Sequence, residues 1–158
     1  MSDSDLNMTG IGVRRGGRTD LAKMHRLFST TIVRVCAKDY DFEQRQVWIA
    51  SIHDTQRWLS LAEDQYLLVA YTATVLCGFA SLKEDRHVDM LYVHPDSQLK
   101  GAGRLLFSGL REQAGRMQQA TMTADVSITA RPFFEKMGFK VLKDQWVERN
   151  GILLPNLA

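Results

Sequence analysis

Residues 98–104 form the segment that most constrains how this chain folds, because they place two glycines, Gly101 and Gly103, between two contrasting patterns. The apolar run before them, residues 87–93, predicts a strand. Beyond them, apolar residues recur at helical spacing, which predicts an amphipathic helix: Leu106, Leu110, Ala114 and Met117. Glycine lacks a Cβ, so the backbone can turn tightly and present several N–H groups to an anion at the positive end of the helix dipole. We therefore expect a strand, a tight turn and a helix N-terminus that together suit a pyrophosphate.

The spacing of these glycines excludes the two commonest nucleotide-binding loops. The dinucleotide fingerprint, Gly-x-Gly-x-x-Gly, would need a glycine where Leu106 stands. The phosphate loop of nucleoside triphosphatases ends in Gly-Lys-Ser/Thr, which the sequence does not contain. What remains is Gln-x-x-Gly-x-Gly directly after a strand that ends in Val93-His94-Pro95. The glycines alone also fit an ordinary helix-initiating turn, so the flanking sequence has to decide.

The composition predicts one ordinary globular domain. The chain has 158 residues, of which 45% are hydrophobic and 24% are charged. We expect residues 1–10 to form a flexible tail and residues 11–158 to form the domain. The formal net charge is only +2, and like charges do not cluster in long runs, so we expect no nucleic-acid partner.

The cysteines and the N-terminus predict the compartment. Cys36 and Cys77 lack metal-ligand spacing, and Cys77 lies in the apolar run 75–79, where a buried thiol is the expected state. The N-terminus is polar and acidic, and no apolar stretch is long enough to span a membrane. We therefore expect a cytoplasmic protein with no membrane span and no metal site.

Periodicity and turn residues predict helices packed on a mixed sheet in one α+β domain. Strands are expected at residues 11–15, 66–71, 75–82, 87–93 and near 121–125. Helices are expected at residues 21–35 and 43–51, as a short turn around Trp58, after the glycine turn, and at residues 128–137. Within residues 139–154, Asn150-Gly151 separates two apolar segments and predicts a closing hairpin.

A second motif lies downstream, at residues 127–139. Its sequence, Ser-Ile-Thr-Ala-Arg-Pro-Phe-Phe-Glu-Lys-Met-Gly-Phe, resembles a hallmark of the GNAT N-acetyltransferase superfamily that is usually written Asn-x-x-Ala-x-x-x-Tyr-Glu-x-x-Gly-Phe. The glycine turn resembles the acetyl-coenzyme A signature of the same superfamily, and the two motifs occur in the family's order. The resemblance follows the order of elements from residue 11 to the C-terminus and is most specific over residues 88–106 and 127–139. Each motif alone also fits ordinary structure, such as a helix with a glycine C-cap.

The resemblance implies a fold and a cofactor. The fold is a single α+β domain with a mixed, mostly antiparallel sheet of about six to seven strands, flanked by helices and splayed between strands four and five. The cofactor is acetyl-coenzyme A, whose pantetheine arm would pair with the backbone of Leu91, Tyr92 and Val93. Its pyrophosphate would lie on the glycine turn: Gln98, Leu99, Lys100, Gly101, Ala102, Gly103 and Arg104. Lys100 and Arg104 are candidates for the outer phosphates, although both also fit solvated surface charges.

Two positions depart from the family pattern. Ser127 stands where an Asn commonly contacts the cofactor arm, and Phe134 stands where a Tyr commonly protonates the departing thiolate. A serine hydroxyl can still form a hydrogen bond, but a phenyl ring cannot donate one. For a thiol of pKa about 8.5, leaving as thiolate at neutral pH costs about 2 kcal/mol. Water or Tyr92 could supply the proton, so activity is still expected while the proton donor stays unassigned.

Residues 87–93 also hold the candidates for proton removal. In the acetyl transfer that the resemblance implies, a neutral amine attacks the thioester carbonyl of acetyl-coenzyme A. Backbone N–H groups near Leu91 to Val93 would stabilise the oxyanion that forms. A primary amine is mostly protonated at neutral pH, so a base or a water chain must take its proton. A carboxylate in an apolar strand is costly to bury without partners. Asp89 is therefore our first candidate for the general base or water-orienting residue, and His87 is its competitor.

Strand alternation predicts how these side chains are divided between the two faces of the strand. One face would carry His87, Asp89, Leu91 and Val93, and the other Val88, Met90 and Tyr92. Two alternatives stay open, because Asp89 could be satisfied by neighbouring donors or solvent and His87 could be an exposed surface residue.

The acceptor is the least defined part of the prediction. Tyr40, Phe42 and Trp48 gather between the first two expected helices, and Tyr40 is a candidate to contact the substrate, although such a cluster also fits a packed lid or core. The leading hypothesis is an acetyl-coenzyme A dependent N-acetyltransferase that acts on a small molecule or on an exposed protein or peptide amine. A non-catalytic acyl-coenzyme A binding or regulatory module is the alternative that Phe134 favours, and a structural domain without a nucleotide is a third. The edge of the closing hairpin also makes a homodimer an open alternative.

Overall fold

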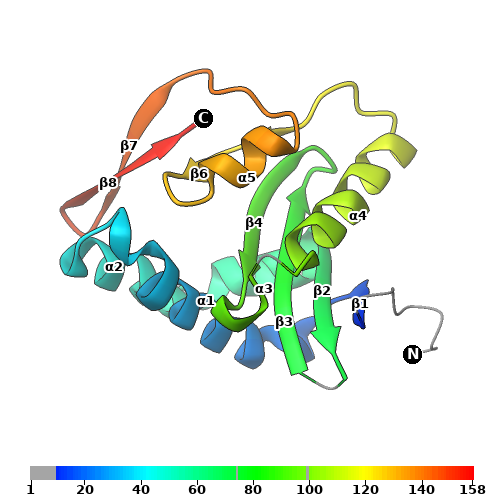
Figure 1. Cartoon of the computed structure of the whole chain (residues 1–158), viewed down its shortest axis with the longest axis horizontal. Helices are drawn as coiled ribbons and strands as arrows, with labels where there is room; N and C mark the ends of the chain where they lie inside the picture. The colour runs from blue at the N-terminus through cyan, green and yellow to red at the C-terminus, as the bar shows by residue number, and fades with distance from the viewer. Residues whose placement is uncertain (1–9, 74, 99) are drawn as a thin grey trace.

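The computed structural model of the whole chain describes residues 10–73, 75–98 and 100–158 (Figure 1). Its helices are α1 (Leu21–Val35), α2 (Phe42–Ile49), α3 (Thr55–Asp64), α4 (Ala102–Arg116) and α5 (Arg131–Lys136). Its strands are β1 (Ile11–Arg15), β2 (Tyr66–Thr72), β3 (Val75–Lys83), β4 (His87–Val93), β5 (Thr123–Ala124), β6 (Val126–Ser127), β7 (Asp144–Arg149) and β8 (Ile152–Leu157). The expected tail, residues 1–10, lies outside the described residues except for Gly10.

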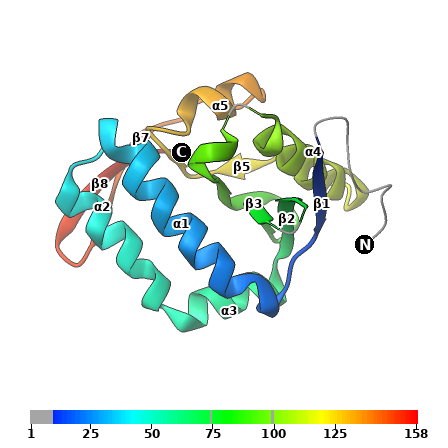
Figure 2. The same ribbon diagram turned by 60° about the horizontal axis from the view of Figure 1, so that its bottom comes forward.

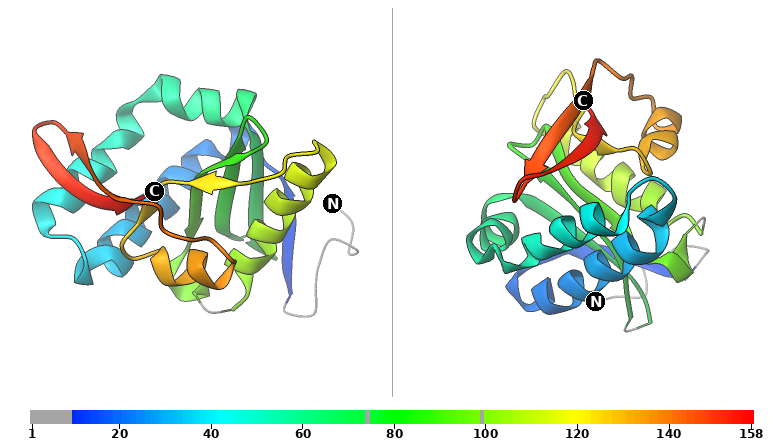
Figure 3. Two further views of the ribbon diagram at one scale, coloured as in Figure 1. Left: turned by 90° about the horizontal axis from the view of Figure 1, so that it is seen from above. Right: turned by 90° about the vertical axis from the view of Figure 1, so that its left-hand side faces the viewer.

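The predicted α+β architecture is confirmed, with the strands divided between two sheets. A five-stranded sheet has the order β1-β2-β3-β4-β5, and a three-stranded sheet has the order β6-β8-β7. Five neighbouring pairs are antiparallel, β1–β2, β2–β3, β3–β4, β6–β8 and β7–β8, whereas β4 and β5 run parallel. The small sheet and β1 lie on opposite sides of the molecule (Figure 3).

Several predicted bounds match the structure and others do not. The strands at residues 11–15 and 87–93 and the helix at residues 21–35 are confirmed as β1, β4 and α1. The single strand expected near residues 121–125 is instead two short strands, β5 and β6, separated by Asp125. The turn expected around Trp58 is the ten-residue helix α3, which Asp54 caps by accepting a hydrogen bond from the Arg57 N–H.

Helices cover both faces of the five-stranded sheet. The apolar side of α4 packs on one face, where Leu106 and Leu110 join Ala80 and Leu82 in a buried cluster. On the other face, α1 and α3 contribute to a second cluster (Figure 2), whose largest members are Phe28, Trp58 and Phe79. The sheet is therefore packed on both faces. The glycine turn and the motif at residues 127–139 both lie at its β4 edge.

The pairing of β4 with β5 is confined to two residue pairs, His87 with Thr123 and Val88 with Ala124. The chain then leaves β4, because Val126 and Ser127 of β6 pair with β8. Among the described residues, β4 beyond Val88 therefore has no strand on this side. The expected splay between the fourth and fifth strands is confirmed.

A β-bulge in β4 changes the expected distribution of its side chains. Ser81 pairs with Met90 and Leu82 pairs with Val88, so Asp89 is an extra residue. Val88 consequently packs on the α4 side together with Leu91 and Val93, while Met90 and Tyr92 pack on the α1 and α3 side. The predicted grouping of Val88 with Met90 and Tyr92 is wrong, and so is that of Asp89 with Leu91 and Val93, since Asp89 contacts Arg57 of α3. A bulge interrupts the two-residue period of a strand.

The two ends of α4 offer a direct test of the glycine turn. Gly101 has φ +93°, where other residues are strained, whereas Gly115 lies inside α4 with open space around an added Cβ. We expect Gly101→Ala to lower the free energy of unfolding by about 1 kcal/mol, and Gly115→Ala to raise it by up to about 1 kcal/mol. Urea denaturation of both variants checks this, and the same sign of change in the two would contradict the assigned turn.

Candidate active site

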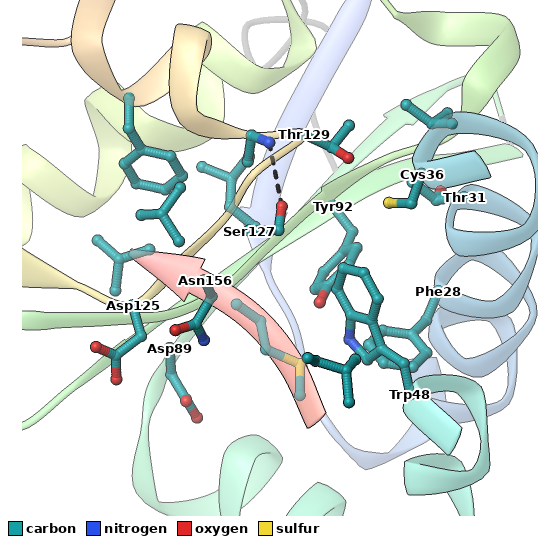
Figure 4. Close-up of a pocket in the computed structure, with 18 of the residues that line it drawn as sticks. Phe28, Thr31, Cys36, Trp48, Asp89, Tyr92, Asp125, Ser127, Thr129 and Asn156 are labelled. Carbon is teal, nitrogen blue, oxygen red and sulfur yellow. Dashed lines mark hydrogen bonds between the residues drawn. The ribbon is translucent and has the colours of Figure 1, made fainter. Parts of the chain in front are cut away.

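A cavity of about 1150 Å³ runs along the open edge of β4 (Figure 4). Its walls come from α1, α2, β4, β6, α5 and the β7–β8 hairpin, and it reaches the glycine turn at Gly101 and Gly103. Both sequence motifs and both candidate bases therefore face one continuous space.

The glycine turn forms as predicted. Gly101 is the N-cap of α4, and no side chain among the described residues caps the helix. The space around Gly101 is open, whereas a Cβ on Gly103 would lie 3.2 Å from the ring of Phe133 on α5. The helix begins with Ala102, which is buried, and the Leu105 N–H donates to the Gly101 carbonyl. One glycine thus shapes the turn, and the other lets α5 pack beside it.

The basic candidates of the turn differ in their position. Arg104 is exposed and lines the cavity, and it forms no ion pair within the part of the chain that the structure describes. Lys100 is exposed. Leu99 lies outside the described residues, so its predicted contact is not placed. Gln98 donates a hydrogen bond of 2.6 Å from Nε2 to the Val93 carbonyl and thereby joins the turn to the end of β4.

The backbone of β4 presents alternate residues to the cavity. The His94 N–H donates to the Cys77 carbonyl on β3, so the amides of Leu91 and Val93 point to the opposite side, where β5 has diverged. The Val93 carbonyl is occupied, because Thr31 Oγ1 donates to it over 3.2 Å in addition to Gln98. The N–H groups of Leu91 and Val93 are therefore directed to the place where an extended ligand could add as a strand.

The two positions that depart from the family pattern have different surroundings. Ser127 Oγ accepts a hydrogen bond of 3.1 Å from the Ala130 N–H at the start of α5 (Figure 4), and its own proton can still be donated. Phe134 is 6% exposed and makes edge contacts with the rings of Phe133 and Phe139. Position 134 therefore contributes to the packing of α5 and offers no proton.

Asp89 is held by two partners. Arg57 donates to both of its oxygens, over 3.0 and 3.1 Å, and Gln65 Nε2 donates to Oδ2 over 2.8 Å. Burial tends to raise the pKa of the Asp89 carboxyl, but the hydrogen bonds from Arg57 and Gln65 outweigh it, so the pKa lies below its usual value. The geometry agrees with the alternative that neighbouring donors satisfy the Asp89 carboxylate. A carboxylate that accepts these hydrogen bonds is a weak base.

His87 stands where β4 and β5 are still paired. Its Nδ1 lies 2.8 Å from Thr123 Oγ1, and its Nε2 lies 3.7 Å from Asp125 Oδ2. Its side chain is 30% exposed and lines the cavity. Thr123 and Asp125 carry no signal in the sequence that links them to His87, because only the register between β4 and β5 brings them to it.

Tyr40 lines the cavity with its hydroxyl already engaged. The hydroxyl donates to the Pro155 carbonyl on β8 and accepts from the Ile128 N–H over 3.0 Å. Its ring meets Trp48 edge-on at 5.2 Å. Tyr40 thus joins the segment before α2 to the hairpin and to β6, and only its ring is available to an acceptor.

Aromatic rings pack around Tyr92 on the side of the sheet that α1 and α3 cover. The ring of Tyr92 stacks on Phe79 at 5.5 Å and lies 4.8 Å from Phe28 and 6.5 Å from Trp48. The sequence analysis predicted the helix that carries Phe28 but assigned no site to this side chain. The apolar periodicity of α1 predicted that Phe28 would be buried, but it could not predict that Phe28 would line the cavity.

Within residues 10–73, 75–98 and 100–158, no helix is long and apolar enough to cross a membrane. The same part of the chain has no group of three or more His, Cys, Asp or Glu side chains placed to hold a metal ion.

The ion pair between Arg57 and Asp89 predicts a pH-dependent stability. Because the pKa of Asp89 is lowered in the folded state, its contribution is present above about pH 4 and is lost as the pH falls through the folded value. We expect Arg57→Met to lower the free energy of unfolding by about 2–3 kcal/mol at neutral pH, since it leaves a mostly buried carboxylate unpaired. Below about pH 4 the loss should shrink, because a protonated Asp89 needs no cation.

Urea denaturation at both pH values measures this difference. The double variant Arg57→Met/Asp89→Asn is the matched control, and we expect it to be more stable at neutral pH than Arg57→Met alone. A loss in Arg57→Met that is the same in acid and at neutral pH would show that the charge of Asp89 does not cause it.

Comparison with known proteins agrees with this geometry. Residues 36–157 match the family described as Acetyltransferase (GNAT) domain. Over 149 residues the chain is 30% identical to the "Uncharacterized N-acetyltransferase YafP" of Escherichia coli (strain K12), with 94% of each protein covered.

Solved structures agree as well. A GCN5-related N-acetyltransferase from Rhodopseudomonas palustris, also described as an aminotransferase of class II, superposes with a TM-score of 0.90 at 33% identity, over 96% of this chain and 95% of that one. The PaiA N-acetyltransferase of Thermoplasma acidophilum, solved with coenzyme A, shares the fold with a TM-score of 0.76 at 20% identity, over 93% and 97% of the two chains. The chain belongs to the GNAT family of acetyltransferases and is an acyltransferase.

Proposed function

We propose that this enzyme transfers an acetyl group from acetyl-coenzyme A to a primary amine by direct attack of the amine on the thioester. The observation that carries the proposal is the open edge of β4, which leads within one cavity from the candidate bases to the glycine turn. This arrangement matches an extended ligand with an anionic end. Attack within one ternary complex needs no acyl-enzyme intermediate, and the buried thiols of Cys36 and Cys77 have a pKa that burial raises, which disfavours a thiolate nucleophile.

The cofactor would lie along β4 and end on α4. The N–H groups of Leu91 and Val93 would pair with the pantetheine arm, and one of them would stabilise the oxyanion. The first-turn amides of α4 would hold the pyrophosphate, with Arg104 at the outer phosphates. The coenzyme A complex of the PaiA relative supports this cosubstrate, since the two proteins share the fold.

The acceptor would enter at the other end of the cavity. There α2 and β8 are joined by the hydrogen bond from Gln44 Nε2 to the Leu153 carbonyl, and Tyr40 adds the bond to Pro155. These connections place walls on two sides of the site. A small amine, or the flexible end of a peptide, fits such a site better than a lysine on a folded surface, which would have to bring its own backbone close.

Of the two candidate bases, His87 is better suited to take the amine proton. Asp89 already accepts hydrogen bonds from Arg57 and Gln65, whereas one nitrogen of His87 faces Thr123 and the other lies near the carboxylate of Asp125. A carboxylate beside an imidazole stabilises the imidazolium that proton removal creates. Asp89 would then act on the acceptor through its charge and through its hold on Arg57.

Binding of acetyl-coenzyme A tests the site. We expect calorimetry to show binding by the wild-type protein and a loss of at least tenfold in affinity for Gly101→Glu, because the new carboxylate repels the phosphates. Gly115→Glu adds the same charge at the far end of α4, where the residue is exposed, and should bind as the wild type does. Release of free thiol over a panel of amines then measures turnover. A protein that binds acetyl-coenzyme A and acetylates no amine would contradict the proposed activity.

The choice of base has its own test. We expect His87→Gln to lower kcat at least tenfold and to leave the affinity for acetyl-coenzyme A unchanged. Its residual rate should rise with the concentration of added imidazole at fixed pH, because an added base can replace the side chain. Asp89→Asn should also lower turnover at least tenfold but should not respond to imidazole. A response to imidazole in Asp89→Asn and none in His87→Gln would assign the base to Asp89 instead.

A further inference from the structure

The hydroxyl groups that line the cavity differ in whether their protons are free. Thr31 donates to the Val93 carbonyl, Tyr40 donates to the Pro155 carbonyl, and Thr129 donates to Asp39. These three protons are committed to protein acceptors. The hydroxyls of Tyr92, Ser127 and Ser51 have no acceptor within the described part of the chain.

Tyr92 is distinct among these three. It is the only phenol of the set, and a phenol is a much stronger acid than the alcohol of a serine. Its position on β4 is between Leu91 and Val93, whose amides face the open edge, so its side chain leaves the strand beside the segment that would hold the thioester. Trp48 lies near this hydroxyl and acts on its pKa as a hydrogen-bond donor would, and the Tyr92 proton is free to be donated because it has no acceptor among the described residues.

Resting on the proposed acetyl transfer, we propose that the Tyr92 hydroxyl is the group that protonates the departing thiolate of coenzyme A. The phenyl ring of Phe134 cannot do so, and it is packed against Phe133 and Phe139. Tyr92 is thus a catalytic residue carried by β4 and not by α5.

The proton balance closes within the site. The amine nitrogen forms a bond to the thioester carbon, the C–S bond breaks, and its electron pair goes to sulfur, which takes the proton of Tyr92. His87 takes the proton that the nitrogen loses and returns it through water to the phenolate. The net change is that one proton moves from the amine to the thiol, and both side chains return to their starting state.

The surroundings of Tyr92 suit a hydroxyl that stays protonated between turnovers. Burial raises the pKa of Tyr92, and the nearby Cys36 and Asp89 act in the same direction, while Trp48 and Arg57 oppose them. A free phenolate is therefore disfavoured, so donation to sulfur and recovery of the proton must be coupled. The guanidinium of Arg57 is the nearby charge that stabilises the phenolate while this happens.

Tyr92→Phe tests the proposal, with Tyr66→Phe as the matched control that removes a hydroxyl bonded to Arg116 away from the cavity. We expect Tyr92→Phe to lower kcat at least tenfold, with the affinity for acetyl-coenzyme A and the melting temperature unchanged. Its residual rate should rise with the concentration of protonated buffer at fixed pH, because an added acid can replace the hydroxyl. The wild type and Tyr66→Phe should show no such dependence.

Three outcomes would overturn the assignment. These are a kcat of Tyr92→Phe close to that of the wild type, a lowered kcat that does not respond to buffer acid, and the same buffer response in Ser127→Ala with Tyr92 intact. Restored activity in Tyr92→Phe/Phe134→Tyr would support the assignment independently, since it supplies a phenol from α5. Failure of the proposed function looks different, because then the wild-type protein itself releases no thiol with any amine.

Discussion

The two-residue pairing of β4 with β5 is the constraint on which the rest of the site depends. If β5 continued beside β4, its backbone would occupy the amides of Leu91 and Val93, and no edge would be left for a ligand. The chain instead crosses at Asp125 and pairs β6 with β8, which also brings the hairpin to the far wall of the cavity. Because the pairing is so short, a cleft opens along β4 and the N–H groups of Leu91 and Val93 stay free for a ligand. The same divergence positions the β7–β8 hairpin as one wall of the cleft.

The bulge at Asp89 has a comparable effect on the side chains of the same strand. It lets Asp89 and Met90 both belong to the side of the sheet that α1 and α3 cover, where Arg57 of α3 can reach the carboxylate. A regular strand would alternate strictly and would place Asp89 and Tyr92 on opposite faces. With the bulge, the charge of the Asp89–Arg57 pair and the hydroxyl of Tyr92 act in one place. The bulge thus helps to build the end of the cavity where the acceptor amine would enter. Bulges next to active sites often redirect side chains in this way.

The sequence predicted those parts of the fold whose signals are local. The glycines predicted a tight turn, and Gly101 adopts a left-handed conformation there. The periodicity of residues 106–117 predicted α4, and the apolar run of residues 87–93 predicted β4 with its observed bounds. The partners of the reactive groups were not predictable in this way. Arg57 meets Asp89 across 32 positions of sequence, and Thr123 meets His87 across 36, in a register set by packing. Tyr40 was predicted to contact substrate because aromatic residues gather between the first two helices. The sequence does not distinguish such a residue from a buried tyrosine whose hydroxyl bonds to two backbone groups, as it does here.

The aromatic residue at position 134 connects the cofactor site to the chemistry. The ring of Phe133 contacts the rings of Phe107 and Phe134 and also faces Gly103, so the packing of α5 is coupled to the first turn of α4. Phe134 is buried in this cluster and also lines the cavity, so its phenyl ring contributes to the cavity wall without offering a proton. Tyr92 on β4 lines the same cavity, so in the proposed mechanism α5 provides packing and β4 provides the proton, and the two roles are not combined in one side chain.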